Sequence, residues 1–401
     1  MKILLIHNAY QQAGGEDAVL QAEAALLSEK GHEVTTFRRR NDEIQVNGFL
    51  SQARLGWETV WARSSYRQLQ AILQSEKPDL AHVHNTLPLI SPAAYYACQD
   101  AGVPVVQTLH NYRLFCPAAT FYRDGHVCEE CLEKSLTRSL RYACYRGSRS
   151  ASAAVAAMLA IHRQLGTWQD KVDVYIALSE FARGKFIAAG LSAEKIVVKP
   201  NFVCPDPGPR AGAGEYALFV GRLSPEKGVQ AMLSAWKRLG QNVPLEIVGG
   251  GPEREKMEAQ APGIAGIRFR GRLPRAETLA AIKGARFLVF PSQWYECFPL
   301  TLVEAFACGT PVIASRLGAM AEVVKDGRTG LHFTPGDPTD LAAKVMWAWE
   351  HPEELAAMGR EARAEYESKY TADTNYEQLL AIYEKAMKQG AGRPPVRGWR
   401  T

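Results

Sequence analysis

Short apolar runs alternate along most of the chain with segments in which apolar residues recur at helical spacing. In the first half, the apolar runs span residues 3–6, 33–37, 80–83, 103–108, 174–178 and 196–198. The alternation restarts further on, with runs at 216–220, 245–248, 267–270, 287–290, 312–314 and 330–333. Strands that alternate with helices form parallel sheets joined by crossover helices. The pattern therefore predicts an α/β protein with two Rossmann-like, doubly wound domains.

A cluster of prolines and glycines over residues 204–214 lies between the two series of strands. Such clusters break regular structure, so this one is the best linker candidate in the chain. We expect a first domain over 1–199 and a second over 200–371. The regions with helical spacing near the end of the chain are about 339–349, 353–368 and 372–388. We expect the last of these helices to cross back to the first domain, and residues 389–401 to form a disordered basic tail.

The composition is that of an ordinary globular protein. With 401 residues, 47% of them hydrophobic, the chain can fill two cores, which excludes the disordered and fibrous classes. The formal net charge of +5 equals the five cations among the last seventeen residues, and a basic tail on a neutral body does not indicate a nucleic-acid partner. The first apolar run is too short for a signal peptide, and no run of eighteen apolar residues occurs. We therefore expect a cytoplasmic protein.

Ligands of doubly wound sheets bind beyond the carboxyl ends of the strands, so the residues after each predicted strand are informative. A glycine pair, 14–15, follows the first strand and opens a helix whose N–H groups suit an anion. Gly221 and Arg222 follow the first strand of the second domain, shortly before Lys227. A guanidinium fork and an ammonium at one strand-to-helix connection predict a clamp for a pyrophosphate. Glycines 249–251 end the next strand, where a backbone without side chains lets a ligand approach.

The most informative segment runs from Phe290 to Val312. A strand is followed by a loop that carries Glu296, and then by a helix that begins near Leu300 and holds Glu304 in its early turns. The N–H groups at that helix start are unpaired and suit phosphate or sugar oxygens. A carboxylate one turn further on can accept hydrogen bonds from both hydroxyls of a ribose. Taken singly, Glu304 is equally consistent with a partner of the helix dipole, but the whole segment favours a nucleotide-sugar site.

The order of these motifs resembles the family-four retaining glycosyltransferases of the GT-B fold. The likeness covers nearly the whole chain and is strongest over 216–335, where Glu296 and Glu304 flank Phe298 with seven residues between the glutamates. It implies two domains that face each other across a cleft. The residues implied to bind the donor are Gly15, Gly221, Arg222, Lys227, Gly250, Leu273, Glu296, Phe298, Pro299, Leu300 and Glu304.

The resemblance also assigns roles. Arg222 and Lys227 are implied to hold the donor pyrophosphate, and Glu304 the ribose. Glu296 is implied to lie against the donor sugar, which His110 hydrogen-bonds from the opposite domain. Glu296, His110 and the two cations form the implied catalytic set.

Three further residues complete the implied donor site. Gly15 is implied to let the first helix approach the donor phosphate, and Leu273 to contact the base. Pro299 stands where a glycine is frequent in the family, which leaves one fewer amide donor. Cations and aligned amides stabilise a leaving pyrophosphate, so no metal cofactor is expected for catalysis, and the chain contains no Asp-x-Asp.

The implied function is transfer of a sugar from a nucleotide-diphosphate donor to a glycan, lipid-linked or small-molecule acceptor, as in surface polysaccharide or glycolipid synthesis. Two alternatives are open. A non-catalytic nucleotide-sugar-binding subunit would bind the donor alone. An epimerase or phosphorylase on the same two-domain plan would need no separate acceptor or would use free phosphate. A dehydrogenase is disfavoured, because the first strand leads into a glycine pair without Gly-x-Gly-x-x-Gly.

A cluster of cysteines follows His110 along the chain. It comprises Cys116, Cys128, Cys131 and Cys144. The Cys-x-x-Cys pair with a cysteine on either side suits a tetrahedral structural zinc site. Free thiols are equally consistent with the spacing, and a disulfide is the third alternative. Four thiolates leave no open position, so we do not expect a catalytic zinc.

Two basic, aromatic stretches mark the first domain. Residues 134–165 carry six cations and no acid, and residues 49–73 carry Trp57 and Trp61 four positions apart. Such stretches suit an anionic membrane surface, where a lipid-linked acceptor would be found. The alternative is that both are ordinary helices that bury their apolar faces.

Overall fold

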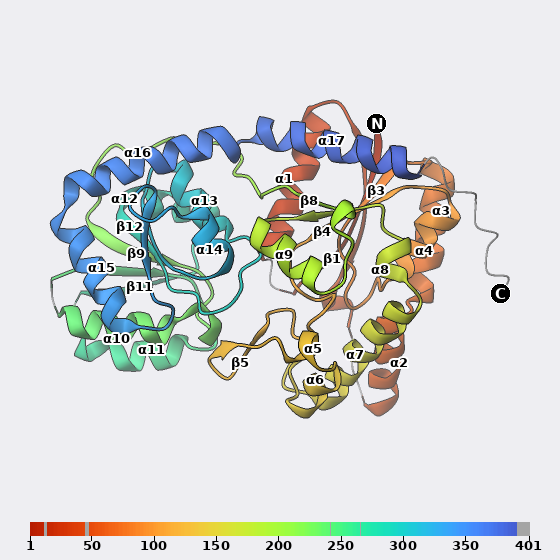
Figure 1. The fold of residues 1–401 in the computed structure, drawn as a ribbon, viewed down its shortest axis with the longest axis horizontal. Helices are drawn as coiled ribbons and strands as arrows, with labels where there is room; N and C mark the ends of the chain where they lie inside the picture. The colour runs from red at the N-terminus through yellow and green to blue at the C-terminus, as the bar shows by residue number, and fades with distance from the viewer. Residues whose placement is uncertain (12–13, 45–47, 241, 265, 391–401) are drawn as a thin grey trace. The chain divides into compact units, whose positions relative to one another are not determined.

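The computed structural model describes the chain except for residues 12–13, 45–47, 241, 265 and 391–401. Most of the predicted tail, 389–401, therefore lies outside the described residues. Contacts divide the chain into two compact units. The first unit comprises residues 1–121, 128–200 and the chain from 376 on, and the second comprises 122–127 and 201–375. Figure 1 shows the elements of both units.

The first unit is built on a parallel sheet. Its strand order is β2 (Glu33–Arg40), β1 (Lys2–Ala9), β3 (Leu80–Asn85), β4 (Val105–Leu109), β7 (Val174–Ala177) and β8 (Ile196–Val198). Its helices are α1 (Gly15–Glu29), α2 (Phe49–Val60), α3 (Arg63–Glu76), α4 (Ala93–Asp100), α5 (Glu130–Glu133), α6 (Thr137–Arg141), α7 (Arg149–Gln164), α8 (Thr167–Asp170) and α9 (Glu180–Ala188). The central strands are buried along almost their whole length, which is why they read as unbroken apolar runs. All six strands predicted for this part of the chain are confirmed.

The second unit repeats this plan. Its parallel strand order is β11 (Ile267–Gly271), β10 (Leu245–Val248), β9 (Tyr216–Val220), β12 (Ala285–Phe290), β13 (Val312–Ser315) and β14 (Gly330–Phe333). Its helices are α10 (Val229–Leu239), α11 (Arg254–Gln260), α12 (Arg275–Gly284), α13 (Leu300–Ala307), α14 (Gly318–Val323), α15 (Pro338–Glu350) and α16 (Pro352–Lys369). Apolar side chains from these strands and helices form two core clusters. The six predicted strands and the predicted helices at the end of the unit are confirmed.

Helix α17 (Ala372–Gly390) begins in the second unit and continues in the first from residue 376 on (Figure 1). The proline- and glycine-rich segment 204–214 belongs to the second unit. Arg210 ties that segment to the unit, because its Nη1 donates to the carbonyl oxygens of Ala285 and Arg286 at 2.7 and 3.0 Å. The expectation that 204–214 is a linker is therefore wrong, since its prolines and glycines shape a segment packed against β12.

One element of the structure has no counterpart in the sequence-based prediction. Strands β5 (Tyr122–Arg123) and β6 (His126–Val127) form a small antiparallel hairpin that groups with the second unit. Two residues per strand are too few to produce a period in the apolar pattern.

Candidate functional site

In each sheet the strand order reverses at one point, and doubly wound folds bind ligands outside the carboxyl ends of the strands that meet there. In the second unit the reversal lies between β9 and β12. In the first unit it lies between β1 and β3. The loops that leave these four strands therefore define the candidate site of each unit.

The loop after β9 carries both predicted phosphate-binding cations. Lys227 ends a short 3-10 turn, and Gly228 follows it with φ +69°. A Cβ at position 228 would overlap the carbonyl oxygen of Pro291, so the loop after β9 packs backbone to backbone on the loop after β12. The glycine beside Lys227 is thus required for packing that places the lysine against the second loop.

Lys227 and Glu296 form an ion pair, with 2.6 Å between Nζ and Oε1. The same carboxylate oxygen accepts hydrogen bonds from Ser292 Oγ at 2.8 Å and from Trp294 Nε1 at 2.7 Å. Lys227 Nζ also lies 5.4 Å from the ring centroids of Phe290 and Trp294, a cation–π distance. Because Glu296 is only 6% exposed, three donors fix one buried carboxylate oxygen at the end of β12.

Arg222 differs from Lys227 in its surroundings. Its side chain is exposed, and it has no hydrogen bond or ion pair with any residue that the structure describes. A guanidinium in this state can bind an anion through paired N–H donors without giving up an existing contact. The two cations of the predicted clamp therefore lie on one loop. Lys227 is paired with Glu296, and the guanidinium of Arg222 is available to a ligand.

Helix α13 begins at Leu300, as predicted, with Pro299 as its N-cap. The first-turn amides of Leu300 and Thr301 have no carbonyl partner within the helix. Glu304 lies one turn on, 13% exposed, with 3.9 Å between its Oε1 and Arg275 Nε. Burial raises the pKa of Glu304, and the charge of Arg275 opposes this shift. The helix start thus offers amide donors and, one turn later, a carboxylate whose lone pairs are mostly unused.

The glycines after β10 have a structural reason that the sequence did not predict. Gly249 has φ +145°, and a Cβ there would overlap the carbonyl oxygen of Gly221. The nearest atoms to a Cβ at Gly250 would be those of the Arg272 side chain, whose Nε would be 3.1 Å away. Packing between two loops therefore accounts for Gly249, whereas a Cβ at Gly221 would meet the Phe219 ring at 3.2 Å and one at Gly250 the flexible side chain of Arg272.

The three apolar residues predicted to contact the donor share one environment. Leu273, Phe298 and Leu300 are partly buried against one apolar core cluster of the second unit. The Phe298 ring centroid is 5.9 Å from that of Tyr370. Each therefore has a packing role, and contact with base or sugar stays a prediction for all three.

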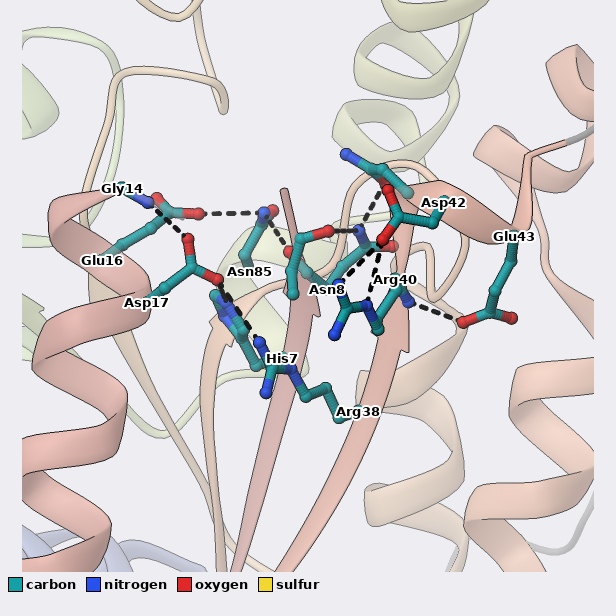
Figure 2. A network of polar contacts seen from close by, with 12 residues as sticks. His7, Asn8, Gly14, Glu16, Asp17, Arg38, Arg40, Asp42, Glu43 and Asn85 are labelled. Carbon is teal, nitrogen blue, oxygen red and sulfur yellow. Dashed lines mark hydrogen bonds and ion pairs between the residues drawn. The ribbon is translucent and has the colours of Figure 1, made fainter. Parts of the chain in front are cut away.

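Figure 2 shows how the loop after β1 is held in the first unit. Asp17 Oδ2 accepts a hydrogen bond from the Gly14 amide at 2.8 Å, which is the half of a capping box that a glycine N-cap allows at the start of α1. Asp17 Oδ1 lies 3.0 Å from Nε2 of the buried His7. A Cβ at Gly15 would meet nothing within 4 Å, so the space beside the first residue of α1 is open to a ligand. Gly15, which is predicted to let α1 approach the donor phosphate, thus lies next to a loop that the contacts of Asp17 with Gly14 and His7 hold in place.

Glu16 lies next to this loop and was not predicted as part of the site. Its Oε1 accepts from Asn85 Nδ2 at 3.0 Å (Figure 2). Its Oε2 accepts from Asn111 Nδ2 at 3.4 Å. Burial raises the pKa of Glu16 to about 8, helped by the charge of Asp17 and opposed by a hydrogen bond from Tyr10. The aspartate three residues after Gly14 was a usable signal for this cap. The two asparagines that contact Glu16 come from the end of β3 and from the loop after β4, so they give no local pattern.

His110 follows β4 and is half-buried. It lines a small cavity together with Asn85 and Asn111, and its Nε2 lies 2.9 Å from Nδ1 of His84. His110 and Gly15 belong to the first unit, and the other predicted donor-binding residues belong to the second. Their meeting across a cleft stays a prediction.

The four clustered cysteines lie in the first unit around Cys131. Burial raises the pKa of Cys131 to about 12, and the nearby thiols of Cys116, Cys144 and Cys128 raise it further. All eight cysteines are within the described residues, and none forms a disulfide. Within that same part of the chain, the single group of three potential ligand side chains within 4.8 Å of one another contains no cysteine. The four sulfur atoms are therefore near one another without reaching metal-coordination spacing.

The two basic stretches form helices α2, α3, α6 and α7, and α2 packs against α7. They also carry every large hydrophobic side chain that is exposed in the described residues, namely Trp57, Tyr142, Ile161 and Leu165. Trp57 is 70% exposed, whereas Trp61 packs on Tyr66 and Tyr96. Most apolar residues of these stretches therefore pack inward and a few face solvent, and contact with a membrane surface stays a prediction. Among the described residues, no helix is long and apolar enough to span a bilayer.

Comparison with known families covers both units. Residues 14–201 match the family model described as "Glycosyl transferase 4-like domain". Residues 207–365 match the model described as "Glycosyl transferases group 1". The chain belongs to the family-four glycosyltransferases.

This family-four glycosyltransferase is similar to several curated proteins. It is 28% identical to the phosphatidyl-myo-inositol mannosyltransferase of Mycolicibacterium smegmatis, over 94% of this chain and 91% of that protein. It is 34% identical to the D-rhamnosyltransferase WbpZ of Pseudomonas aeruginosa and 35% identical to a Mycobacterium tuberculosis glycogen synthase. The last two matches span only 42% and 46% of those relatives, so they reach less than half of each.

Solved structures agree on the fold. HepE from Anabaena, in complex with UDP-glucose, matches with a TM-score of 0.68 at 20% identity, over 96% of this chain and 99% of that one. Sucrose-phosphate synthase from Thermosynechococcus elongatus matches with a TM-score of 0.71 at 19% identity, again over 96% and 99% of the two chains. The family-four glycosyltransferase therefore has the GT-B fold, with two α/β domains.

Proposed function

We propose that this protein transfers a hexosyl group from a nucleotide-diphosphate sugar to a glycan, lipid-linked or small-molecule acceptor, with retention of configuration and without a catalytic metal. The observation that carries the proposal is the convergence of Lys227, Ser292 and Trp294 on Glu296, where the sheet order reverses. A buried carboxylate fixed by three donors, with an available arginine on the same loop as Lys227, suits a ligand that carries both hydroxyl groups and a diphosphate.

The chemistry follows from the charges that develop. As the anomeric bond breaks, negative charge builds on the leaving diphosphate, and Arg222 and Lys227 stabilise that charge more in the transition state than in the ground state. The first-turn amides of α13 add donors that are already oriented. Glu304 holds the ribose, Glu296 holds the donor sugar, and His110 approaches the sugar from the first unit. Attack by the acceptor on the face that the diphosphate leaves gives retention.

A lipid-linked acceptor is the class we favour. The first unit has a cavity of about 460 Å³ between α2 and α7, lined by residues that include Leu55, Thr59 and Val155. The exposed Trp57 lies on α2, the helix that supplies Leu55 and Thr59 to this lining. The phosphatidyl-myo-inositol mannosyltransferases, by their name, act on a lipid. We propose that the protein is cytoplasmic and rests on the inner membrane surface while it acts in surface polysaccharide or glycolipid synthesis.

Two measurements test the proposed function. Thermal unfolding is followed with a panel of UDP-, GDP- and ADP-sugars, because a ligand that binds only the native state raises the melting temperature. The stabilising donor is then incubated with extracted lipid and with glycan acceptors, and transfer is measured by mass spectrometry. We expect one donor class to stabilise the protein and to lose its sugar. Stabilisation without transfer to any acceptor would favour the non-catalytic binding subunit.

The cysteine cluster carries a separate proposal. We propose that Cys116, Cys128, Cys131 and Cys144 close around a structural zinc ion, because the three other sulfur atoms are near enough to Cys131 to raise the pKa of its thiol, and four clustered cysteines supply the ligand set of a tetrahedral zinc site. Such a metal would order the segment from 116 to 144 and take no part in catalysis.

A further inference from the structure

A line of buried polar side chains in the first unit leads from the core to His110. Lys199 Nζ lies 2.8 Å from Glu23 Oε1, and Glu23 Oε2 lies 3.5 Å from His84 Nε2. His84 Nδ1 in turn lies 2.9 Å from His110 Nε2, with the two rings stacked at a centroid distance of 5.1 Å. Lys199, Glu23 and His84 are at most 3% exposed. The four residues come from the end of β8, from α1, from β3 and from the end of β4.

The charge states along this line are settled by burial and by Lys199. Burial alone would raise the pKa of Glu23, but the ammonium group of Lys199 holds it below its ordinary value, so the group is a carboxylate. Burial lowers the pKa of His84 well below its usual range and that of His110 to about 3. Both imidazoles are therefore neutral at pH 7, and each carries one proton on one of its two nitrogens.

The contacts determine which nitrogen carries the proton. Glu23 Oε2 and His84 Nε2 are both buried without a hydrogen-bond partner at normal distance, and they face each other. Two lone pairs in that position would repel, so the proton of His84 lies on Nε2, directed at the carboxylate. Its Nδ1 is then an acceptor, and His110 must donate from Nε2. Nδ1 of His110 is left with a lone pair and with no hydrogen bond to a described residue.

A metal ion does not account for this cluster. Glu23, His82 and His84 have ligand atoms within 4.8 Å of one another. Both ring nitrogens of His82, however, are already within 2.8 Å of hydroxyl groups, those of Tyr383 and Thr108. The positive charge beside the carboxylate is supplied by Lys199.

We propose that Glu23 and His84 are positioning residues that hold His110 in the Nε2-protonated tautomer, so that its Nδ1 accepts a hydrogen bond from a hydroxyl of the donor sugar. This inference rests on the proposed function for its sugar partner. The tautomer itself is a property of the free protein and can be measured without any donor.

The test uses the full chain labelled with 15N-histidine, in which long-range 1H–15N correlation spectra report the tautomer of each ring. Signals of His110 are assigned by their loss in His110→Asn. In the wild type we expect His110 to be protonated at Nε2 alone at pH 7. A wild-type His110 protonated at Nδ1 would overturn the proposal.

Glu23→Gln should reverse the whole line. Lys199 can only donate, so the amide oxygen of the glutamine faces it and the amide N–H₂ faces His84 Nε2. His84 then carries its proton on Nδ1 and donates to His110 Nε2, and His110 moves to the Nδ1-protonated tautomer. The matched control is Tyr383→Phe, which removes an equally buried hydrogen bond to His82 and leaves the His110 signals unchanged. A His110 that keeps its tautomer in folded Glu23→Gln contradicts the proposal.

Kinetics with the donor found in the thermal panel give the second readout. We expect Glu23→Gln to lower transfer about ten-fold, because the sugar hydroxyl can no longer donate to His110 Nδ1 and must turn to accept from it, and Tyr383→Phe to leave transfer near wild type. If no donor supports transfer by the wild type, the proposed function fails while the tautomer result stands. If the wild type transfers the sugar, and Glu23→Gln changes the tautomer of His110 without lowering the rate of transfer, the sugar contact of His110 is refuted.

Discussion

Replacement of Lys227 by methionine separates the contribution of the Lys227–Glu296 pair to stability from its contribution to the rate of transfer. The change keeps the stem that packs near Phe290 and Trp294 and removes the ammonium, which lies 2.6 Å from Glu296 Oε1. The carboxylate keeps its hydrogen bonds from Ser292 and Trp294. Because those donors remain, we expect a stability loss of about 1–3 kcal/mol rather than the larger loss seen when a buried charge is left without any partner.

The catalytic effect should be larger. Loss of one donor to a developing oxyanion typically lowers turnover by about 10²–10³-fold, and Lys227 is proposed to serve the leaving diphosphate in this way. Activity is measured as the initial rate of transfer, and stability as the melting temperature without ligand. A loss of about 1–3 kcal/mol in a unit of this size lowers the melting temperature by roughly 2–12 °C.

Two further variants make the result decisive. Lys227→Met with Glu296→Gln removes both charges, so the melting temperature should recover in part while transfer stays low. Lys185→Met breaks a Lys–Glu pair of the same length, to Glu129, with similar exposure but in the first unit, and should cost stability alone. Folded Lys227→Met with near-normal transfer would refute the role of the lysine in the clamp.

Four further predictions concern separate parts of the molecule. Arg222→Ala should abolish transfer with little change in melting temperature, because the side chain is exposed and has no partner among the described residues; a large drop in melting temperature would show a structural role instead. Glu16→Gln should flatten the pH dependence of stability. Burial raises the pKa of Glu16 to about 8, so the stability of the wild type falls as pH rises from about 4.5 to 8. An unchanged pH profile of the melting temperature in Glu16→Gln would show that Glu16 does not titrate in this range. Protein purified under reducing conditions should hold close to one zinc per chain by elemental analysis, and the metal should be lost in Cys131→Ser; zinc below a trace would favour free thiols. Flotation with liposomes that contain anionic lipid should carry the wild type but much less Trp57→Ser, and equal flotation of both would exclude the α2 surface.

The twelve strands of the two sheets could be predicted because parallel strands buried on both faces leave unbroken apolar runs. The strand-end residues Arg222, Lys227, Glu296 and Glu304 could be found for the same reason, since the carboxyl ends of known strands point to the ligand side. The start of α13 was also readable, from the strand and loop that precede Leu300.

The features that escaped prediction depend on contacts between distant segments. Gly228 and Gly249 are needed where loops pack backbone to backbone, which no local pattern reveals. The line from Lys199 to His110 joins four elements that are far apart in sequence. Segment 204–214 was predicted to be a linker because it is rich in proline and glycine. The same residues also occur in irregular segments that pack against a domain, as this one does.

The most direct test of the central claim is a crystal structure of the protein with the nucleotide sugar that stabilises it most. The account predicts the diphosphate at Arg222 and Lys227, the ribose hydroxyls at Glu304, and the sugar between Glu296 and His110. A donor bound elsewhere, or a diphosphate with neither cation within hydrogen-bond distance, would contradict it.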